Sequence, residues 1–310
     1  MKIIRGIANL HAQFAQCVLT MGNFDGVHLG HRSLLARLRE VGRQYDLPTV
    51  VMIFEPQPLE FFSPDRAPAR LTSFQEKYHQ FCQLGIDYLL CIPFNEHVGS
   101  LSATLFVQEW LVKQLGAQYV IVGDDFAFGA RRQGNKQLLD HYAQQGCFRF
   151  ESLQAFEYQS LRVSSTAIRD ALAQADFVLA EKLLGRPYAI CGKVIHGNAL
   201  ARQLGFPTAN VHLQRNKAAL QGVFAVEVIR IATGLTYHGI ANIGIKPTVE
   251  GKKTTLEVNI FEFNQDIYGE DLQVLFRQKI RDEQKFTSLD ALQKQIAQDV
   301  CIAREIKAKF

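Results

Sequence analysis

The chain has 310 residues, of which 47% are hydrophobic and 21% are charged, a composition typical of a water-soluble globular protein with room for two domains. Its net charge of +4 is mild and its basic residues are scattered, which argues against nucleic acid as a partner. No apolar run approaches the roughly 18 residues of a membrane span, so the sequence predicts no membrane partner.

Neither the cysteines nor the N-terminus indicates export. The six cysteines form no Cys-x-x-Cys pair, and four of them lie in apolar runs, which favours buried, reduced thiols. The N-terminus has no apolar stretch long enough for a signal peptide, because Arg5, Asn9 and His11 interrupt it. We therefore expect a reducing, cytoplasmic location.

In the first half of the chain, β-rich runs alternate with helical patterns. This alternation predicts an α/β domain whose doubly wound parallel sheet is covered on both faces and binds ligands beyond the carboxyl ends of its strands. Ser102 is the expected N-cap of the third helix. The expected strands are 17–21, 49–54, 88–92, 119–122 and 147–150, and the expected helices are 31–44, 73–84, 102–115 and 134–145.

A change of period marks the second domain. Residues 166–184 are expected to form a helix pair or a bent helix, which Gly185-Arg186-Pro187 ends, so we divide the chain into domains 1–184 and 185–310. Successive strands without helices between them then predict an antiparallel barrel or sandwich. These strands are expected at 188–195, 223–231, 235–243, 255–263 and 272–276.

A C-terminal helix is expected after Thr287 or Ser288, one of which caps it. Its apolar spacing predicts one buried face. That face is expected to carry Leu289, Leu292, Ile296 and Val300. The mixed-charge stretch 277–285 just before this helix is interpreted as solvated surface.

The stretch Gly22-Asn23-Phe24-Asp25-Gly26-Val27-His28-Leu29-Gly30-His31 follows the first of these strands and opens a helix. Such a turn offers free N–H groups and the positive end of a helix dipole to a phosphate, and glycines allow its close approach. His28 and His31 are three residues apart and can point into the same space. Bound phosphates favour imidazolium and the helix N-terminus disfavours it, so each ring can donate to oxygens as charge develops at an α-phosphate.

A histidine pair at a helix start is most often structural or exposed, but the whole string is more specific. It resembles the first signature of the HxGH nucleotidyltransferases, and its Asp-Gly-Val-His form resembles their FAD synthetase branch. The resemblance implies that His28 and His31 are catalytic. It also implies that the ATP phosphates are held by Gly22, Asn23, Phe24, Asp25, Gly26 and Gly30.

A second cluster combines hydroxyls at a helix start with a cation one turn later. Ser164, Ser165 and Thr166 can hold phosphates, and Arg169 can neutralise a departing pyrophosphate. Serine or threonine before a helix is usually only a cap. The cluster nevertheless resembles the Ser-Ser-Thr-x-x-Arg element of FAD synthetases, which implies a catalytic role for Arg169.

Two loops resemble the same family. Residues 54–58 resemble its loop after the second strand, with Gln57 where many relatives have His. Residues 122–129 resemble its adenine- and flavin-side loop, which implies ligand contacts for Asp124, Asp125 and Phe126. For the two aspartates, a turn with a helix cap is an equal alternative.

In the second domain, Gly205-Phe206-Pro207-Thr208-Ala209-Asn210 is expected in a turn between strands. Thr208 and Asn210 alternate, so on an extended backbone both point to one side, and their oxygens suit Mg²⁺. The six residues resemble the metal and ATP signature of riboflavin kinases. That resemblance implies ATP contacts for Gly205 and Pro207.

Two further segments resemble riboflavin kinases. Residues 241–248 resemble an Asn-Ile-Gly-x-Arg-Pro-Thr segment, which implies ATP contacts for Asn242 and Lys246. In 255–261 the apolar residues alternate with Glu257 and Asn259, so Glu257 points away from the core, toward a site or solvent. The resemblance implies that Glu257 is the general base for the 5′-hydroxyl of riboflavin.

Some residues depart from the family pattern. Lys246 stands where Arg is usual, Asn259 where many relatives have His, and Ala199 and Ala201 lie in a phosphate loop, 197–202, that is often richer in glycine. None of these removes a chemically necessary group. We expect a changed rate or affinity rather than inactivity.

Almost the whole chain resembles the bacterial bifunctional riboflavin kinase/FAD synthetase family. The resemblance implies that riboflavin and ATP-Mg²⁺ give FMN in the second domain, and that FMN and ATP-Mg²⁺ give FAD and pyrophosphate in the first. The alternatives are that only one half is active, or that the chain is a non-enzymatic flavin-binding protein. The sequence leaves the oligomeric state and any channelling of FMN open.

Overall fold

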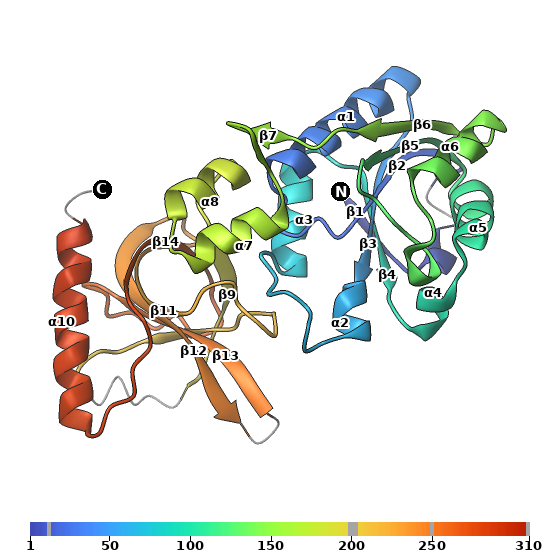
Figure 1. Cartoon of the computed structure of the whole chain (residues 1–310). Helices are drawn as coiled ribbons and strands as arrows, with labels where there is room; N and C mark the ends of the chain where they lie inside the picture. Colours follow the sequence, from blue (N-terminus) through green and yellow to red (C-terminus); the bar gives the residue numbers. More distant parts are fainter. Residues whose placement is uncertain (11–13, 198–203, 249–250, 308–310) are drawn as a thin grey trace. The chain divides into compact units, whose positions relative to one another are not determined.

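The computed structural model describes residues 1–10, 14–197, 204–248 and 251–307. The chain forms two compact units (Figure 1). The N-terminal unit comprises Met1–Pro68 and Gln75–Ser164, and the C-terminal unit comprises Ala69–Phe74 and Ser165–Phe310.

The N-terminal unit contains the expected parallel sheet, with the strand order β1-β4-β3-β2-β5-β6. Edge strand β1 was not predicted, because only one of its four residues is buried and it has no apolar run to signal it. Central strand β2 is buried along its whole length. The strands are β1 (Lys2–Arg5), β2 (Cys17–Met21), β3 (Thr49–Glu55), β4 (Tyr88–Pro93), β5 (Ala117–Gly123) and β6 (Arg149–Leu153).

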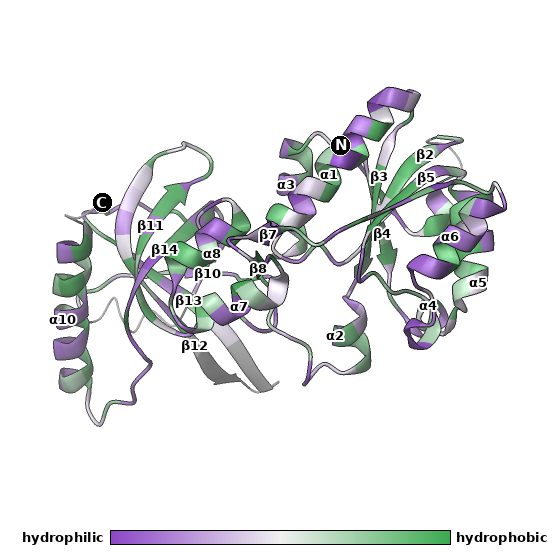
Figure 2. Ribbon diagram, turned by 45° about the horizontal axis from the view of Figure 1, so that its top comes forward, coloured by the Kyte–Doolittle hydropathy of each residue, from purple (hydrophilic) through white to green (hydrophobic). Residues whose placement is uncertain are grey.

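Helices cover both faces of this sheet, which confirms the doubly wound architecture. Helices α1 and α3 lie on one face, and α5, the π-helical η2 and α6 lie on the other (Figures 1 and 2). The single helix expected at 102–115 is divided into α5 and η2, and Ser102 caps its start as expected. The helices are η1 (Ile7–Asn9), α1 (Leu29–Tyr45), α2 (Pro58–Phe62), α3 (Phe74–Gln83), α4 (Glu96–Ser100), α5 (Ala103–Leu105), η2 (Phe106–Gln114), η3 (Ala130–Arg132) and α6 (Lys136–Gln144).

The connections reverse direction between β2 and β5, which are neighbours in the sheet. From β2 the chain proceeds through α1 to β3, and from β5 it proceeds through α6 to β6 on the other side. Such a switch point opens a crevice at the carboxyl ends of the two strands. The turn after β2 and the loop after β5 both begin there.

The C-terminal unit contains a closed antiparallel barrel with the order β10-β13-β12-β11-β14-β9, so the barrel alternative is confirmed. The expected helix pair, which the division of the sequence assigns to domain 1–184, belongs to this unit together with the barrel. The prediction that Asn210 lies in a turn is wrong, because this residue lies in the short strand β10. The elements are α7 (Ser165–Ala173), α8 (Phe177–Leu184), β9 (Ala189–Ile195), β10 (Ala209–Val211), β11 (Gly222–Arg230), β12 (Thr236–Thr248), β13 (Gly251–Ile260) and β14 (Asp271–Arg281). A small hairpin, β7 (Glu157–Tyr158) and β8 (Leu161–Arg162), precedes α7.

The C-terminal helix α10 (Leu289–Lys307) packs against the barrel, and Ser288 is the residue that caps it. Of the residues expected on its buried face, Leu292, Ile296 and Val300 are partly buried, and Val300 packs against the core of the barrel. Leu289 is exposed, whereas Asp299 and Ala303 are buried. The helix therefore turns a carboxylate toward the barrel, which hydrophobic spacing alone could not indicate.

Among the helices of the described residues, none is both long and apolar enough to cross a membrane. All six cysteines are free thiols.

The thiol of Cys17 is expected to resist alkylation in the native protein. Cys17 is fully buried in β2, and this burial raises the pKa of its thiol far above the usual range, so almost no reactive thiolate forms. Iodoacetamide followed by peptide mass spectrometry should label exposed Cys301 in the native state and Cys17 only after denaturation. Equal labelling of the two thiols in the native state would contradict the prediction.

Candidate active sites

The turn between β2 and α1 has an unusual backbone. Phe24, Gly26 and Val27 have φ values of 48°, 87° and 40°, a left-handed region that is costly for a β-branched residue such as Val27. Phe24 and Val27 are buried, and the Phe24 ring contacts the ring of Phe81 edge-on at 5.5 Å. Packing therefore maintains a conformation that an isolated turn would avoid, as is common at ligand sites.

The two histidines of this turn lie together, as their spacing predicts. His28 is the N-cap of α1, and its Nδ1 accepts a hydrogen bond from the backbone N–H of His31 at 3.3 Å. The rings are stacked with their centroids 3.6 Å apart. Because Nδ1 of His28 accepts, its proton is on Nε2, so that atom can donate to a ligand oxygen.

Gly22, Asp25 and Gly30 of this turn differ in their surroundings. The N–H of Gly22 donates to the carbonyl oxygen of Met52 at 3.1 Å, so it continues the sheet instead of facing a phosphate. A Cβ at Gly30 would lie 3.2 Å from the His28 ring, so glycine there allows the ring to lie against the helix. Asp25 is buried, at 3% exposure.

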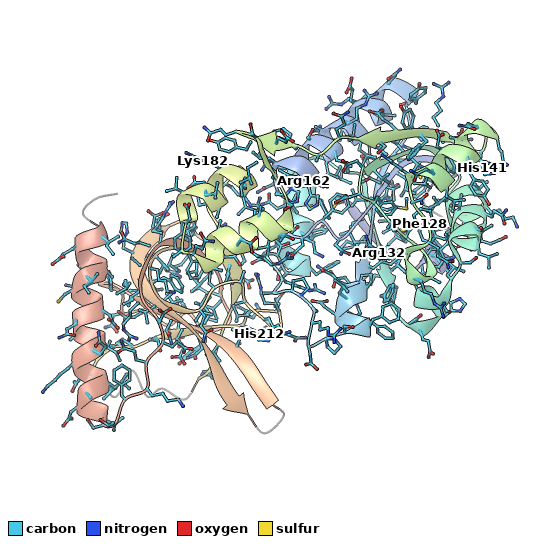
Figure 3. The ribbon with its side chains drawn as sticks, viewed as in Figure 1. Phe128, Arg132, His141, Arg162, Lys182 and His212 are labelled. Atoms are coloured by element: carbon cyan, nitrogen blue, oxygen red, sulfur yellow. The ribbon has the colours of Figure 1, made fainter. Side chains whose placement is uncertain are left out.

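The loop after β5 has a positively charged partner. Arg162 of β8, labelled in Figure 3, donates to the carboxylates of Asp124 at 3.3 Å and Asp125 at 2.7 Å. Phe126 is half-buried, and its ring stacks on that of Phe128. The two carboxylates thus fasten a hairpin to this loop, which is a role additional to the ligand contacts expected from the sequence.

The loop after β3 presents aromatic surface. Phe61 and Phe62 of α2 are 41% and 58% exposed, and both contact the ring of Phe94. Gln57 is the N-cap of this helix, and its side-chain amide nitrogen is buried without a hydrogen-bond partner in the described part of the chain. Flat apolar surface beside an unsatisfied donor is suited to a planar heteroaromatic ligand.

The cluster 164–169 lies at the start of α7. Ser165 is the first residue of the helix, Ser164 precedes it, and Thr166 is exposed. Nε of Arg169 donates to the carbonyl oxygen of Ala69 at 2.7 Å within the C-terminal unit. This arginine therefore also anchors the segment Ala69–Phe74.

The barrel brings three predicted site residues side by side. Asn210 of β10 pairs with Glu257 of β13, and Glu257 pairs with Asn242 of β12. Directly paired residues of an antiparallel sheet point to the same face, so the three side chains form a row across three strands. The polar and apolar faces of β13 are as expected, since Leu256, Val258 and Ile260 are buried while Glu257 is only partly covered.

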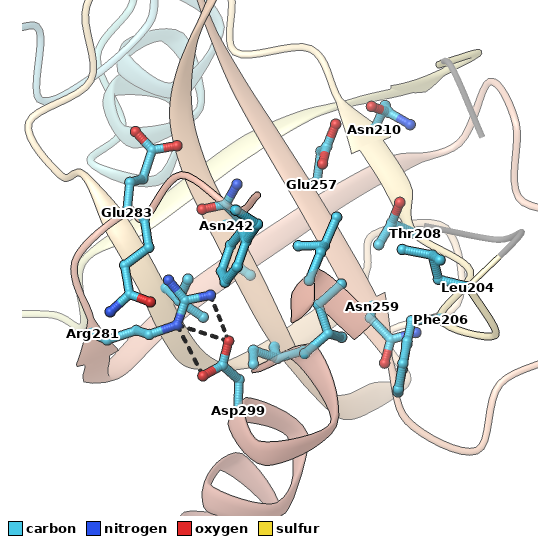
Figure 4. Close-up of a pocket in the computed structure, with 17 residues that line it drawn as sticks. Leu204, Phe206, Thr208, Asn210, Asn242, Glu257, Asn259, Arg281, Glu283 and Asp299 are labelled. Atoms are coloured by element: carbon cyan, nitrogen blue, oxygen red, sulfur yellow. Dashed lines mark hydrogen bonds and ion pairs between the residues drawn. The ribbon is translucent and has the colours of Figure 1, made fainter. Parts of the chain in front are cut away.

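This row lines a cavity of about 290 Å³ in the C-terminal unit. Figure 4 shows Thr208, Asn210 and Glu257 at one end of the cavity and Arg281 and Asp299 at the other. Its remaining wall is largely apolar. The wall residues include Leu204, Phe206, Val223, Ile240, Phe286, Leu292 and Ile296.

A second cavity, of about 240 Å³, lies beside the first and shares Thr208 with it. Ile260, Phe263 and Tyr268 contribute to its lining. The Tyr268 ring also stacks on that of His196 at 3.9 Å. Apolar and aromatic side chains next to a row of oxygen and amide groups are suited to a nucleobase whose phosphates extend toward that row.

The loop before β10 is tied to β13. Nδ2 of Asn259 donates to the carbonyl oxygen of Pro207 at 2.6 Å, so the residue that departs from the family pattern holds the loop that carries Thr208. Gly205 has φ of 89°, which glycine adopts at no steric cost. Ala199 and Ala201 lie outside the described residues, and of Lys246 only the backbone in β12 is described.

The comparisons with known proteins identify two enzyme families along the chain. The FAD synthetase family model matches residues 10–167, and the riboflavin kinase family model matches residues 184–307. A bifunctional riboflavin kinase/FMN adenylyltransferase of Escherichia coli strain K12 is 50% identical over 306 residues, 98% of this chain and 97% of the relative. The chain belongs to this bifunctional family. It carries the FAD synthetase domain first and the riboflavin kinase domain second.

Other bifunctional relatives also align over nearly their whole length. The protein of Pseudomonas fluorescens is 49% identical, with 99% of this chain and 98% of the relative covered. A crystal structure from Streptococcus pneumoniae, described as a macrolide-efflux protein, has a TM-score of 0.79 and 31% identity, with 97% of this chain and 98% of that chain covered. The fold of this chain is therefore similar to that of a solved structure with 31% sequence identity.

The Arg281 and Asp299 end of the kinase-domain cavity was not predicted from the sequence. The stretch 277–285 was interpreted as solvated surface, which is wrong for Arg281. Its guanidinium forms a bidentate ion pair with Asp299 of α10, with Nη2–Oδ2 at 2.7 Å and Nε–Oδ1 at 3.0 Å, and both side chains are largely buried. The only sequence signal was Asp299 among apolar residues of an amphipathic helix.

Replacing Asp299 with alanine is expected to loosen α10. The change leaves the largely buried Arg281 without its counter-charge, which typically costs about 3–5 kcal/mol. Hydrogen-exchange mass spectrometry should show faster exchange across α10, while Asp282→Ala, which alters a neighbouring exposed carboxylate, should not. Unchanged protection of α10 in the Asp299 variant would contradict this prediction.

Proposed function

We propose that this chain catalyses two consecutive reactions, phosphorylation of riboflavin by ATP to give FMN and adenylylation of FMN by a second ATP to give FAD. The observation that carries the proposal is the row Asn210–Glu257–Asn242 beside a cavity, in a chain whose two domains match the two enzyme families in order. We assign adenylylation to domain 1–184 and phosphorylation to domain 185–310.

In the kinase reaction, the flavin occupies the larger cavity and the adenine the smaller one. Because Thr208 lines both cavities, the riboflavin hydroxyl in one can approach the triphosphate of the ATP in the other. The Glu257 carboxylate takes the proton of the riboflavin 5′-hydroxyl as its oxygen bonds to the γ-phosphorus. The bond from that phosphorus to the β–γ bridging oxygen breaks, and ADP leaves.

Thr208 and Asn210 are the residues that hold Mg²⁺ in this proposal. A hydroxyl and an amide oxygen suit a hard cation that keeps several waters and binds phosphate oxygens. A Cβ at Gly197 would overlap the Asn210 amide, so glycine there leaves room for this side chain at the site. When bound, the cation neutralises charge on the triphosphate. Asn242, Lys246, Gly205 and Pro207 complete the ATP contacts.

In the adenylylation, a phosphate oxygen of FMN bonds to the α-phosphorus of ATP. The bond from that phosphorus to the α–β bridging oxygen breaks, and pyrophosphate leaves. His28 and His31 donate to the phosphate oxygens as charge develops, and the backbone of the turn 23–30 and the hydroxyls of Ser164, Ser165 and Thr166 hold the triphosphate. Arg169 neutralises the pyrophosphate.

The aromatic surface of α2 supports a flavin site beside the turn. Phe62 offers a face for the isoalloxazine ring, and the buried amide of Gln57 gains a hydrogen-bond partner when an oxygen of the ligand approaches. Asp124, Asp125 and Phe126 border the same site from the loop after β5. Cytoplasmic location, and small molecules rather than nucleic acid or membrane as partners, complete the proposal.

A liquid-chromatography assay of the full chain with riboflavin, ATP and Mg²⁺ tests the proposal. FMN should appear first and then be converted to FAD. Product that stops at FMN, or no product unless FMN is supplied, would reduce the function to one half of the chain. Flavin binding without turnover of ATP would instead support a non-enzymatic flavin-binding protein.

A further inference from the structure

The N-terminal unit contains a buried cation that the proposed mechanism does not use. Lys77 lies on α3 and is 0% exposed, although lysine is almost never fully buried without a partner. Its Nζ donates to Oε1 of Glu55 at 2.8 Å and to the backbone carbonyl oxygen of Asn23 at 3.3 Å. One ammonium group thus joins the carboxyl end of β3 to the turn that precedes α1.

The Asn23 carbonyl that Lys77 contacts lies at the start of the turn before α1. Asn23 immediately precedes Phe24, whose left-handed backbone begins the strained part of the turn. Helix α3 also carries Phe81, whose ring contacts the Phe24 ring. The Phe24 ring contacts the ring of His31, with the two ring centroids 5.1 Å apart. Helix α3 therefore supports the turn twice, through a charged donor and through an aromatic ring.

We infer that Lys77 is a positioning residue for adenylyl transfer. Its ammonium holds the Asn23 carbonyl and so keeps the turn 22–28 and the stacked histidines in the arrangement that receives the α-phosphate. This inference rests on the proposed adenylylation at His28 and His31. Lys77 is fully enclosed and acts through the turn, so it is not a phosphate ligand itself.

A purely structural role makes a different prediction. If Lys77 served only to neutralise Glu55, removal of both charges would restore the site, because a buried ion pair can be replaced by uncharged groups at little cost. If Lys77 acts through the Asn23 carbonyl, removal of Glu55 as well cannot restore that hydrogen bond. Lys77→Met, Glu55→Gln and the double variant therefore separate the two roles.

The experiment measures kcat and KM for FAD formation from FMN and ATP with the full chain. Lys77→Met is expected to lower kcat about 100-fold, the scale of a small misplacement of reacting groups, with a much smaller change in KM. The double variant should remain at least tenfold slower than Glu55→Gln alone. Lys113→Met, which removes an exposed lysine paired with Glu109, is the matched control and should retain the full rate.

Folding is followed in the same samples. Trp110, the single tryptophan of the chain, is buried in the N-terminal unit, so its emission reports the integrity of that unit. Phosphorylation of riboflavin by the same samples should be unchanged. If the wild-type chain makes no FAD, the proposed adenylylation is wrong. If the wild type is active, the variants test the role of Lys77 alone.

Three results would overturn the inference while the wild type remains active. Lys77→Met could retain kcat within threefold of the wild type. The double variant could match Glu55→Gln alone, which would reduce Lys77 to a counter-charge. Both Lys77 variants could lose the native emission of Trp110, which would make Lys77 a requirement of folding.

Discussion

Replacing both His28 and His31 with alanine is expected to stop FAD formation while riboflavin is still phosphorylated. The stacked rings are the side-chain donors at the α1 N-terminus, and loss of one donor to a developing oxyanion typically costs about 2.7–4 kcal/mol, or roughly 100- to 1,000-fold in rate. We expect at least the larger of these losses for the pair, measured as kcat with FMN and ATP. The two effects need not add, because the rings act as one unit.

The capping role of His28 must be separated from its proton donation. Asparagine is a good N-cap, so His28→Asn retains an acceptor for the His31 N–H but lacks the imidazole donor. This variant should keep the native emission of Trp110 and still lose most of the adenylylation rate. His141→Ala, which removes an exposed histidine of α6, is the matched control. Near-normal FAD formation by the double alanine variant would exclude the histidines from the reaction.

Glu257→Gln is expected to have the opposite effect, with loss of FMN formation and normal conversion of supplied FMN to FAD. Glutamine preserves the size of the side chain and its place between Asn210 and Asn242, but it cannot accept the hydroxyl proton. General-base catalysis typically contributes about 100- to 10,000-fold, so kcat of the kinase reaction should fall by that range while KM for riboflavin changes little.

The neighbouring Glu262→Gln is the control for this variant, because Glu262 is an exposed glutamate just beyond β13. It should leave both reactions at the wild-type rate. A Glu257→Gln variant that retains more than a tenth of the kinase rate would show that another group, or water, takes the proton. For the histidine variants the kinase reaction serves as the internal reference, and for Glu257→Gln the adenylylation serves as the reference.

Local patterns in the sequence were sufficient for the element types and for the faces of the site strands. Alternation in 255–261 predicted that Glu257 points away from the core, because side chains of a strand point to opposite faces in turn. The spacing of His28 and His31 predicted that they meet, because residues three apart share one face of a helix start. Element boundaries and the short strands β1 and β10 were not predicted. Such short segments become strands through pairing with their neighbours rather than through residue preference.

By itself, the sequence therefore determined the order of the two domains, their classes of fold and the groups able to do the chemistry. Only the tertiary structure decided which of these groups meet. Asn210, Glu257 and Asn242 become neighbours through the pairing of β10, β13 and β12, and Lys77 and Arg281 become buried because Glu55 and Asp299 lie where their charges can be paired. A charged residue predicts exposure until a distant partner offsets its desolvation, and that partner is a property of the fold.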